Sequence, residues 1–412
     1  MKRPILTFFN FYIFTFLFLL SCTANSQTNG SEEDTLLVDT PQVHHLSLLF
    51  AGDLMQHGPQ IKAALQSDGT YDYTECFRYM KQEISEADVA IVNFETTLAD
   101  KPYTGYPTFC APDEFLRDCQ KAGFDIMLTA NNHSCDKGKK GIERTIMMMD
   151  SLHIPHLGSY VDEAARKQQY PFLLEKNGFR IVLLNYTYGT NGIPVPKPNI
   201  INTIDTLQIR KDISAAKAMN PDAIIAFMHW GVEYTLKPVA SQVTLADWLL
   251  RQGVTHVIGG HPHVVEPIEV REDANGDKHV VAYSLGNFVS NQSQEHTYGG
   301  MLVKLDLEKI SPSPQPDGNL PIEGEMSKGQ RGSVCRVSDC NYSLYFVTRP
   351  VMSGHKQHRV YPVSIPDSLI TPAEARLRDT FVNSIRPFFE KNNKNVHEVM
   401  TFDISSFLEE DE

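Results

Sequence analysis

Seven short apolar runs recur up to residue 286, and they constrain the fold more than any other feature of the chain. Each run is rich in Val, Ile, Leu and Phe, and they cover residues 46–52, 88–94, 124–130, 180–186, 223–229, 256–260 and 280–286. Near-continuous apolar runs of this length are typical of strands buried on both faces of a sheet. Stretches with helical spacing lie between them, at 141–152 and 241–253. This alternation predicts an α/β domain with a largely buried sheet.

The composition changes after the predicted domain, which we place at residues 46–308. Residues 311–333 are rich in Pro, Gly and Ser, which indicates a long loop or insertion within a C-terminal appendage at 309–412. A strand at 343–351 and a terminal helix at 371–392 are expected there. The face of this helix is expected to pack on the core rather than bind a partner, because its apolar residues recur at helical spacing; they are Leu377, Phe381, Ile385 and Phe388.

The N-terminus has the pattern of an export signal. Lys2 and Arg3 precede a short apolar stretch that ends in Leu-Leu-Ser-Cys at Cys22. A basic start, an apolar core and a small residue before the break are typical of a secretory signal peptide. The junction resembles a bacterial lipoprotein signal, in which Cys22 carries the lipid, and a simple membrane anchor is the alternative. We expect residues 1–22 to be the signal and the polar residues 23–45 to be a flexible tether to the cell-envelope membrane.

The charge of the chain excludes one class of partner. The 412 residues include 37 Lys and Arg against 50 Asp and Glu, a net charge of -13. A nucleic-acid partner is not expected, because binding a phosphate backbone requires a basic surface.

Six cysteines remain besides Cys22, and their spacing does not match a zinc finger. Cys335 and Cys340 are near each other in a loop-like stretch, and they could form a disulfide in an exported protein. Buried free thiols are the alternative, and we expect that state for most of the six.

Five of the predicted strands end in, or are followed by, side chains that can bind metals. They are Asp53, Glu95, Asn131, Asn132, His133, His229, His261 and His263. In buried α/β sheets, ligands gather beyond the carboxyl ends of the strands, so these residues are expected to converge on one crevice. A single histidine after a strand is usually structural, but the joint pattern favours a shared metal site.

The types of these side chains narrow the choice of metal. Imidazole combined with carboxylate suits Zn, Mn or Fe, and no set of thiolates is offered. Two carboxylates facing two divalent ions would leave the site positive, so the expected guest is an anion such as a phosphate ester. Divalent ions activate water for attack on such esters and stabilise the charge that develops.

Six motifs occur in one order: GDLM, NFET, ANNHSCDKG, HWGVEY, GGHPHVVEP and YSLGNFV. Together they resemble the bacterial capsule-synthesis CapA (poly-γ-glutamate synthesis) family, a branch of the calcineurin-like metallophosphatases. The resemblance covers about residues 46–305 and implies two facing sheets flanked by helices. It also implies a role at the cell envelope with an anionic small-molecule or polymer substrate, and with capsule-synthesis machinery as possible partners.

The resemblance also implies roles for individual residues. The implied ligands of one or two divalent ions are Asp53, Glu95, Asn132, His229, His261 and His263. His133 matches the position of a proton donor to the leaving group. Asp136 could orient that imidazole, and a solvated loop carboxylate is the equal alternative. Residues expected to line the pocket are Asn93, Asn131, Glu233, Tyr234 and Asn287, although a structural turn at Asn287 is equally compatible with the sequence.

Two departures from the superfamily pattern bear on catalysis. The first motif of the superfamily is Asp-x-His, whereas Met55 occupies the histidine position here. A thioether is a poor ligand for a hard ion, so one metal position lacks a ligand unless His57 substitutes. Glu95 also replaces a shorter bridging aspartate. These changes predict a weaker second ion, or none.

Two functions are therefore carried forward. One is a metal-dependent, phosphoesterase-like hydrolase at the envelope. The other is a non-catalytic accessory factor that binds an anionic capsule polymer during synthesis or export.

Overall fold

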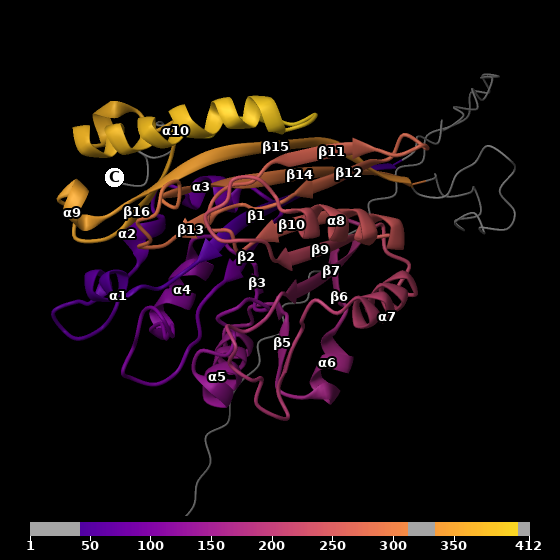
Figure 1. Cartoon of the computed structure of the whole chain (residues 1–412), viewed down its shortest axis with the longest axis horizontal. Helices are drawn as coiled ribbons and strands as arrows, with labels where there is room; N and C mark the ends of the chain where they lie inside the picture. Colours follow the sequence, from indigo (N-terminus) through magenta and orange to yellow (C-terminus); the bar gives the residue numbers. More distant parts are fainter. Residues whose placement is uncertain (1–41, 312–333, 403–412) are drawn as a thin grey trace, which may run out of the picture. The chain divides into compact units, whose positions relative to one another are not determined.

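Two β-sheets face each other at the centre of the computed structural model, which describes residues 42–311 and 334–402 (Figure 1). The larger sheet has nine strands, and its main path in spatial order is β16 (Arg359–Pro362), β15 (Val334–Thr348), β14 (Gly299–Ser311), β1 (Gln42–Leu54), β2 (Val89–Phe94), β3 (Ile126–Leu128) and β4 (His156–Leu157). β13 (Asn287–Val289) pairs with β1, and β17 (His397–Glu398) pairs with β15.

The smaller sheet has six strands. Their order is β11 (Ile268–Glu272), β12 (Lys278–Ala282), β10 (His256–Gly260), β9 (Ala223–His229), β7 (Phe179–Thr187) and β6 (Phe172–Lys176). A separate two-stranded ribbon joins β5 (Ser159–Tyr160) and β8 (Ile200–Ile201). The predicted α/β fold with two facing sheets is confirmed.

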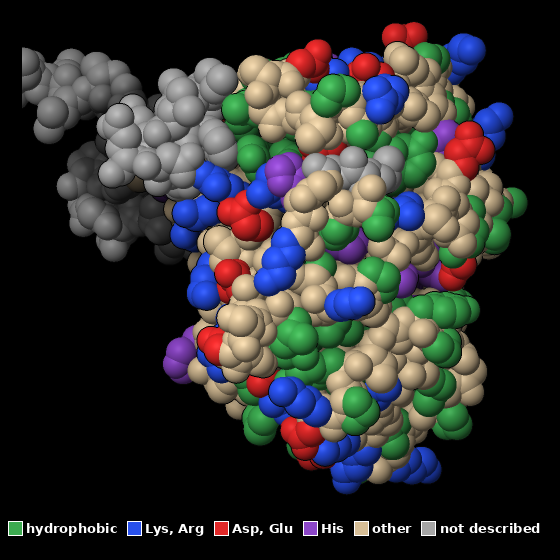
Figure 2. Space-filling view, turned by 90° about the vertical axis from the view of Figure 1, so that its left-hand side faces the viewer, with side chains coloured by type: hydrophobic (Ala, Val, Ile, Leu, Met, Phe, Trp, Pro, Cys, Tyr) green, Lys and Arg blue, Asp and Glu red, His purple; other side chains and the backbone are tan. Residues whose placement is uncertain are grey.

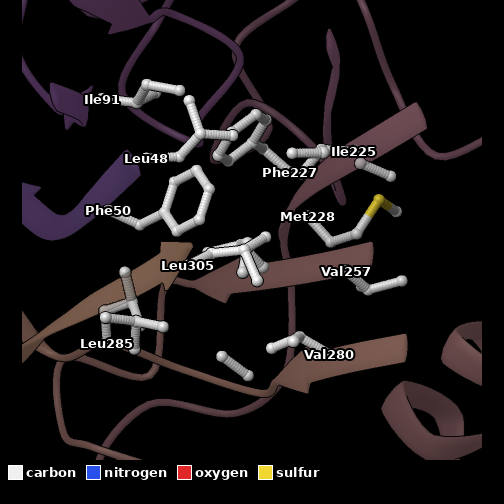
Figure 3. Close-up of a cluster of buried hydrophobic side chains, with 14 of the residues drawn as sticks. Leu48, Phe50, Ile91, Ile225, Phe227, Met228, Val257, Val280, Leu285 and Leu305 are labelled. Carbon is white, nitrogen blue, oxygen red and sulfur yellow. The ribbon is translucent and has the colours of Figure 1, made fainter. Parts of the chain in front are cut away.

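The main core lies between the two sheets. Side chains alternate along a strand, so Leu48 and Phe50 of β1 point to one face and Leu49 and Ala51 to the other. The Phe50 ring lies edge-on to Phe227 of β9, with ring centroids 5.6 Å apart (Figure 3). The inward-facing residues of both sheets therefore share one buried cluster.

Helices cover the outer faces of both sheets. Phe77 of α2 (Thr74–Phe77), Phe115 of α4 (Asp113–Lys121) and Met149 of α5 (Gly138–Ser151) belong to the core on the outer face of the larger sheet. Ile209 of α7 (Thr206–Lys217) and Leu249 of α8 (Ala240–Gln252) belong to the same buried cluster as the smaller sheet. The remaining helices are α1 (Gly58–Ala64), α3 (Lys81–Ser85), α6 (Glu163–Gln169), α9 (Pro350–Ser353), α10 (Pro372–Asn392) and the short 3-10 helix Asp367–Leu369.

The run at 280–286 forms less strand than its composition suggests. β12 ends at Ala282, and the chain crosses to the larger sheet, where β13 begins at Asn287. Gly286 has a φ of 72°, a conformation that favours glycine. The backbone also passes close to Gly52 here, because a Cβ on Gly52 would lie only 1.9 Å from the carbonyl oxygen of Gly286. The motif is therefore a crossover between sheets, and it delivers Asn287 to the strand ends.

The C-terminal part of the described chain extends the larger sheet. The predicted boundary between residues 308 and 309 lies within β14, and β15 pairs with β14 along most of its length. Helix α10 lies along β15 (Figure 1) and buries Phe381 and Ile385 of the predicted face. Leu377 and Phe388 of that face are only partly buried, and Phe389, which was not predicted, is buried in their place. The Pro- and Gly-rich stretch lies largely outside the described residues.

The cysteines of the described chain are free. Cys335 and Cys340 stand in β15 rather than in a loop, opposite Lys309 and Leu305 of β14. Five residues of extended strand span roughly 16 Å, whereas a disulfide needs Cα atoms within about 7 Å. A disulfide between these two cysteines is therefore excluded in this fold.

Among the described residues, no helix has the length and apolar character needed to cross a membrane. The predicted signal peptide with Cys22 and residues 23–41 of the predicted tether lie outside the described residues. Residues 42–45 were also assigned to the tether, but they form the beginning of β1, where they pair with β14.

Candidate metal centre

The predicted ligands come together because the strands that carry them are parallel. β1, β2 and β3 run parallel in the larger sheet, and β9 and β10 run parallel in the smaller one. Their carboxyl ends meet between the sheets, where Asp53 of β1 comes within 3.3 Å of His263 after β10. Histidine side chains are visible near the middle of the face shown in Figure 2.

Asn93 holds the two buried carboxylates in place. Its Nδ2 group donates to Asp53 Oδ1 at 2.7 Å and to Glu95 Oε2 at 3.1 Å. Asn131 donates in turn to Asn93 Oδ1 at 3.1 Å. Asn131 therefore fixes the orientation of the Asn93 amide, and it does so from its own position after β3.

His229 and Asn132 join the two sheets. His229 Nε2 lies 2.9 Å from Asn132 Oδ1 and 3.8 Å from Glu95 Oε1. The first distance is that of a hydrogen bond, and it also brings both atoms close enough to reach one ion.

His263 is oriented by Asn287. Its Nδ1 atom lies 3.0 Å from Asn287 Oδ1, while Nε2 lies 4.0 Å from Glu95 Oε1. The amide of Asn287 donates to Gln292 Oε1 at 2.8 Å and to the Thr297 carbonyl at 3.1 Å, which fixes its oxygen toward His263. An N–H at Nδ1 leaves Nε2 as the nitrogen with a free lone pair.

The loop that carries two of the histidines has a strained backbone. His261 and His263 have φ angles of 98° and 60°, which residues other than glycine rarely adopt. A Cβ on the preceding Gly260 would lie 3.0 Å from Asp53 Oδ1, so glycine permits the close approach of this loop to the carboxylate. Strain of this kind is commonly stored at functional sites.

Burial and neighbouring charges tune the ionisation of the site. Burial raises the pKa of Glu95 well above its usual range, and the nearby Asp53 carboxylate adds to the shift. Burial alone would raise the pKa of Asp53 as well, but its hydrogen bonds with His263 and Asn93 help to lower it to about 2. The two carboxyls therefore differ, and one is ionised at neutral pH.

The histidines are poised to bind metal. Burial lowers the pKa of His229 well below its usual range, and the neighbouring His261 contributes. Burial and the nearby His263 lower the pKa of His261 to about 3. Both imidazoles are neutral at physiological pH, which is the form that binds metals.

Two groups of side chains could each hold a cation. One comprises Asp53, Glu95 and His263, and the other comprises Glu233, His261 and His263; within each group the ligand atoms lie within 4.8 Å of one another. Within the described part of the chain, Glu95 Oε1 and His261 Nδ1 are buried without a hydrogen-bond partner. Buried polar atoms normally have partners, so these two atoms fit the presence of a divalent metal.

His133 and Asp136 form a buried pair beside this centre. His133 Nδ1 lies 2.7 Å from Asp136 Oδ2, which also accepts a 2.6 Å hydrogen bond from the backbone N–H of Phe109. The Asp136 side chain is 1% exposed, so the solvated loop carboxylate considered as an alternative is not what the structure shows. Asp136 is placed to hold the imidazole with Nδ1 protonated and Nε2 free.

Within the described residues, the structure shows no further candidate metal ligand near the GDLM motif that carries Asp53 and Met55. Met55 is 1% exposed and offers only a thioether, and neither group of candidate ligands includes His57. His57 Nδ1 instead lies 3.2 Å from Gln60 Oε1 and 3.3 Å from the backbone nitrogen of Asn291.

Sequence reasoning missed two residues that follow β7. The Tyr188 ring lies 4.5 Å from that of His261, and Asn191 Oδ1 accepts a 3.2 Å hydrogen bond from Asn132 Nδ2. The available signal was their position directly after the strand-like run at 180–186.

A profile described as "Bacterial capsule synthesis protein PGA_cap" matches residues 47–292, which is more than half of the chain. The chain belongs to this family. The match includes every one of the candidate metal ligands described above, from Asp53 to His263. The family is one of capsule and poly-glutamate synthesis proteins.

Two Bacillus proteins are similar to this chain over much of their length. "PGA biosynthesis protein CapA" of Bacillus subtilis (strain 168) is 30% identical over 294 residues, covering 68% of this chain and 72% of that protein. "Capsule biosynthesis protein CapA" of Bacillus anthracis is 28% identical over 273 residues, covering 64% of each protein. This chain thus matches slightly less than two thirds of the Bacillus anthracis relative.

Among solved structures, the Haemophilus influenzae NAD nucleotidase NadN aligns with a TM-score of 0.42 and 10% sequence identity. The alignment covers 90% of this chain and 67% of that one. A likeness of this size assigns neither a fold nor a function.

Proposed function

We propose that this member of the capsule-synthesis family is an envelope protein with a metal-dependent, phosphoesterase-like hydrolase site. The observation that carries the proposal is the convergence of two carboxylates, an amide oxygen and three imidazoles from the ends of five strands. A scaffold without chemistry would have little physical reason to bury such a set of ligands together.

The residues that would hold the metal divide between the two sheets. Asn132 and His229 would hold an ion together with the group of Asp53, Glu95 and His263, in which Glu95 lies within reach of both histidines. When bound, divalent Zn, Mn or Fe supplies Lewis acidity and lowers the pKa of bound water. The rest of the proposed reaction depends on the chain's own groups.

His133 is the proposed proton donor to the leaving group. Its Nδ1–H is engaged by Asp136, so Nε2 is the atom that gives up and regains a proton. Asp136 acts as a positioning residue, because its carboxylate fixes the orientation of the ring. The ring of Phe109 lies 4.4 Å from that of His133 and limits its rotation.

The proposed substrate carries negative charge. Two divalent ions facing only Asp53 and Glu95 would leave the centre positive, which favours a phosphate ester or a segment of an anionic polymer. The names of the Bacillus relatives, which refer to capsule and PGA biosynthesis, support an anionic polymer or a precursor linked to it.

The test is hydrolysis of bis(p-nitrophenyl) phosphate by the full-length protein, purified in detergent and supplied with Zn²⁺ or Mn²⁺. We expect metal-dependent turnover that His133→Ala lowers by about 10²–10⁴-fold while metal content is kept, since general acid catalysis contributes that much. His397→Ala, at an exposed histidine of β17, is the matched control and is expected to leave the rate unchanged.

The second function kept in view is accessory binding of a capsule polymer without catalysis. The observation that favours it is Met55, which adds no ligand at the first motif. A protein that holds metal but hydrolyses no phosphodiester would contradict the hydrolase proposal and support this one.

We also propose that Cys22 anchors the chain to the envelope membrane through lipid. The motive is the Leu-Leu-Ser-Cys junction after a short apolar segment. In cells, Cys22→Ala should move the protein out of the detergent-soluble membrane fraction or leave its signal uncleaved. Unchanged processing and partitioning would contradict lipidation.

A further inference from the structure

Glu233 lies beside the buried histidines although it does not follow a strand directly. It stands in the loop after β9, its side chain is exposed, and it forms a group with His261 and His263 whose ligand atoms lie within 4.8 Å of one another. We propose that Glu233 and His261 form an outer divalent-cation position at the solvent-facing side of the centre. This inference rests on the metal binding of the proposed function and adds a ligand to it.

The placement of Glu233 is fixed by the backbone around it. The N–H of Tyr234 donates to the Pro262 carbonyl at 2.8 Å, and the N–H of Trp230 donates to the Gly260 carbonyl at 3.1 Å. These two hydrogen bonds tie the loop at 230–234 to the loop that carries His261 and His263. The backbone of Glu233 is thus held beside the loop of the two histidines, which keeps its carboxylate within reach of them.

A second observation points to a ligand at this position. His261 is 4% exposed, and its Nδ1 atom has no hydrogen-bond partner among the described residues. Its ring lies 4.9 Å from that of His229, 5.8 Å from that of His263 and 4.5 Å from that of Tyr188. A buried imidazole nitrogen without a partner is costly, and a bound cation would satisfy it.

The outer position differs from the inner group made of Asp53, Glu95 and His263. With Nδ1–H of His263 directed at Asn287, only Nε2 of that ring offers a lone pair, so His263 can serve one ion at a time. Glu233 and His261 are the members that belong to the outer group alone. They therefore define it, and an outer ion completes its coordination with solvent or an anionic substrate.

Charge balance supports a third carboxylate in the centre. Two divalent ions bring four positive charges, and Asp53 and Glu95 offset two of them. Glu233 would offset a third and leave one positive charge, which matches a phosphodiester monoanion. The exposed Glu233 also compensates in ligand number for Met55, which supplies none.

The test is a titration of the full-length protein with Mn²⁺, and binding is measured by isothermal titration calorimetry and by electron paramagnetic resonance of Mn²⁺. Neither measurement needs a substrate. We expect two ions in the unmodified protein. Glu233→Gln should weaken one of them by at least about tenfold, and His229→Ala should weaken the other, because each removes a direct ligand. Glu295→Gln, the same change at an exposed glutamate outside both ligand groups, is the matched control.

The outcomes separate this inference from the proposed function. Loss of one ion in Glu233→Gln but not in Glu295→Gln supports the outer position. If Glu233→Gln binds Mn²⁺ as the unmodified protein does while His229→Ala loses it, the outer position is wrong and the metal-dependent function stands. If the unmodified protein binds no Mn²⁺ and no Zn²⁺, both fail together.

Discussion

Glu266, at the end of the loop that carries His261 and His263, is a fully buried carboxyl group with a single hydrogen-bond donor. Gln242 Nε2 donates to its Oε2 atom at 2.7 Å, and Oε1 has no partner among the described residues. Burial raises the pKa of Glu266 to about 8, although the hydrogen bond from Gln242 opposes the shift. Glu266 therefore stays protonated in the folded protein at neutral pH.

A pH-dependent stability follows from this residue. Between the usual pKa of about 4.5 and the raised value, the folded state binds a proton that the unfolded state has released. The free energy of unfolding therefore falls as pH rises through this window, by up to about 1.4 kcal/mol per pH unit. Glu266→Gln should remove that loss, so the stability of the variant relative to the unmodified protein should be greater at pH 8 than at pH 5.

The measurement is urea unfolding of the unmodified protein and of Glu266→Gln at several values between pH 5 and pH 8. Glu272→Gln, at an exposed glutamate of β11, is the control and should follow the unmodified protein. Equal pH dependence in Glu266→Gln and the unmodified protein would show that Glu266 is ionised in the folded state.

Single residues also show how far the sequence could predict the centre. Asp53, Glu95, His229 and His263 were found because each lies at or just after the end of an apolar run and has the chemistry of a ligand. Tyr188 and Asn191 were missed, because a tyrosine and an asparagine in a loop have no pattern that indicates a tertiary contact. The supporting role of Asn131 and the ligand geometry of Glu233 depend on hydrogen bonds between distant loops, which no local pattern encodes.

At the scale of elements, helix α10 tests how the C-terminal part is held to the fold. Phe381 is fully buried, its ring lies 6.0 Å from that of Tyr298, and a Cβ on Gly299 of β14 would lie 2.7 Å from its Cζ atom. Glycine at position 299 thus makes room for the phenylalanine ring. Helix and sheet fit closely at this point.

Truncating this side chain should destabilise the whole fold. Phe381→Ala removes a buried ring and leaves a cavity, so we expect a loss of about 3–5 kcal/mol in the free energy of unfolding. Asn383→Ala, on the exposed face of the same helix, should change it by less than about 0.5 kcal/mol. Urea unfolding measures both, and a loss below about 1 kcal/mol for Phe381→Ala would show that α10 is not part of the cooperative core.

Elements were predicted best where the apolar pattern was strong. The run at 223–229 matches β9, and the run at 371–392 matches α10 closely, because burial on both faces or on one helical stripe leaves a clear pattern. The strand over Cys335 and Cys340 was taken for loop, since polar residues alternate there on a partly exposed edge region of β15. The crossover at 283–286 was assigned to a strand, because its apolar residues are buried without being in a sheet.

At the scale of the whole molecule, the centre exists because two sheets present their parallel strand ends to each other. The larger sheet supplies the carboxylates and Asn132, and the smaller sheet supplies the three ligand histidines. Neither sheet alone could complete a set of ligands. The sequence predicted the two-sheet fold through its resemblance to the family, whereas the alternation of strands and helices alone predicted only a buried α/β sheet.

The most direct test of the account is elemental analysis of the full-length protein, because the central claim is that these strand ends hold a divalent metal. The account predicts at least one equivalent of Zn, Mn or Fe in the unmodified protein and in His397→Ala, and a marked loss in His229→Ala. An unmodified protein that holds no metal after incubation with Zn²⁺ and Mn²⁺, or a His229→Ala variant with full occupancy, would contradict it.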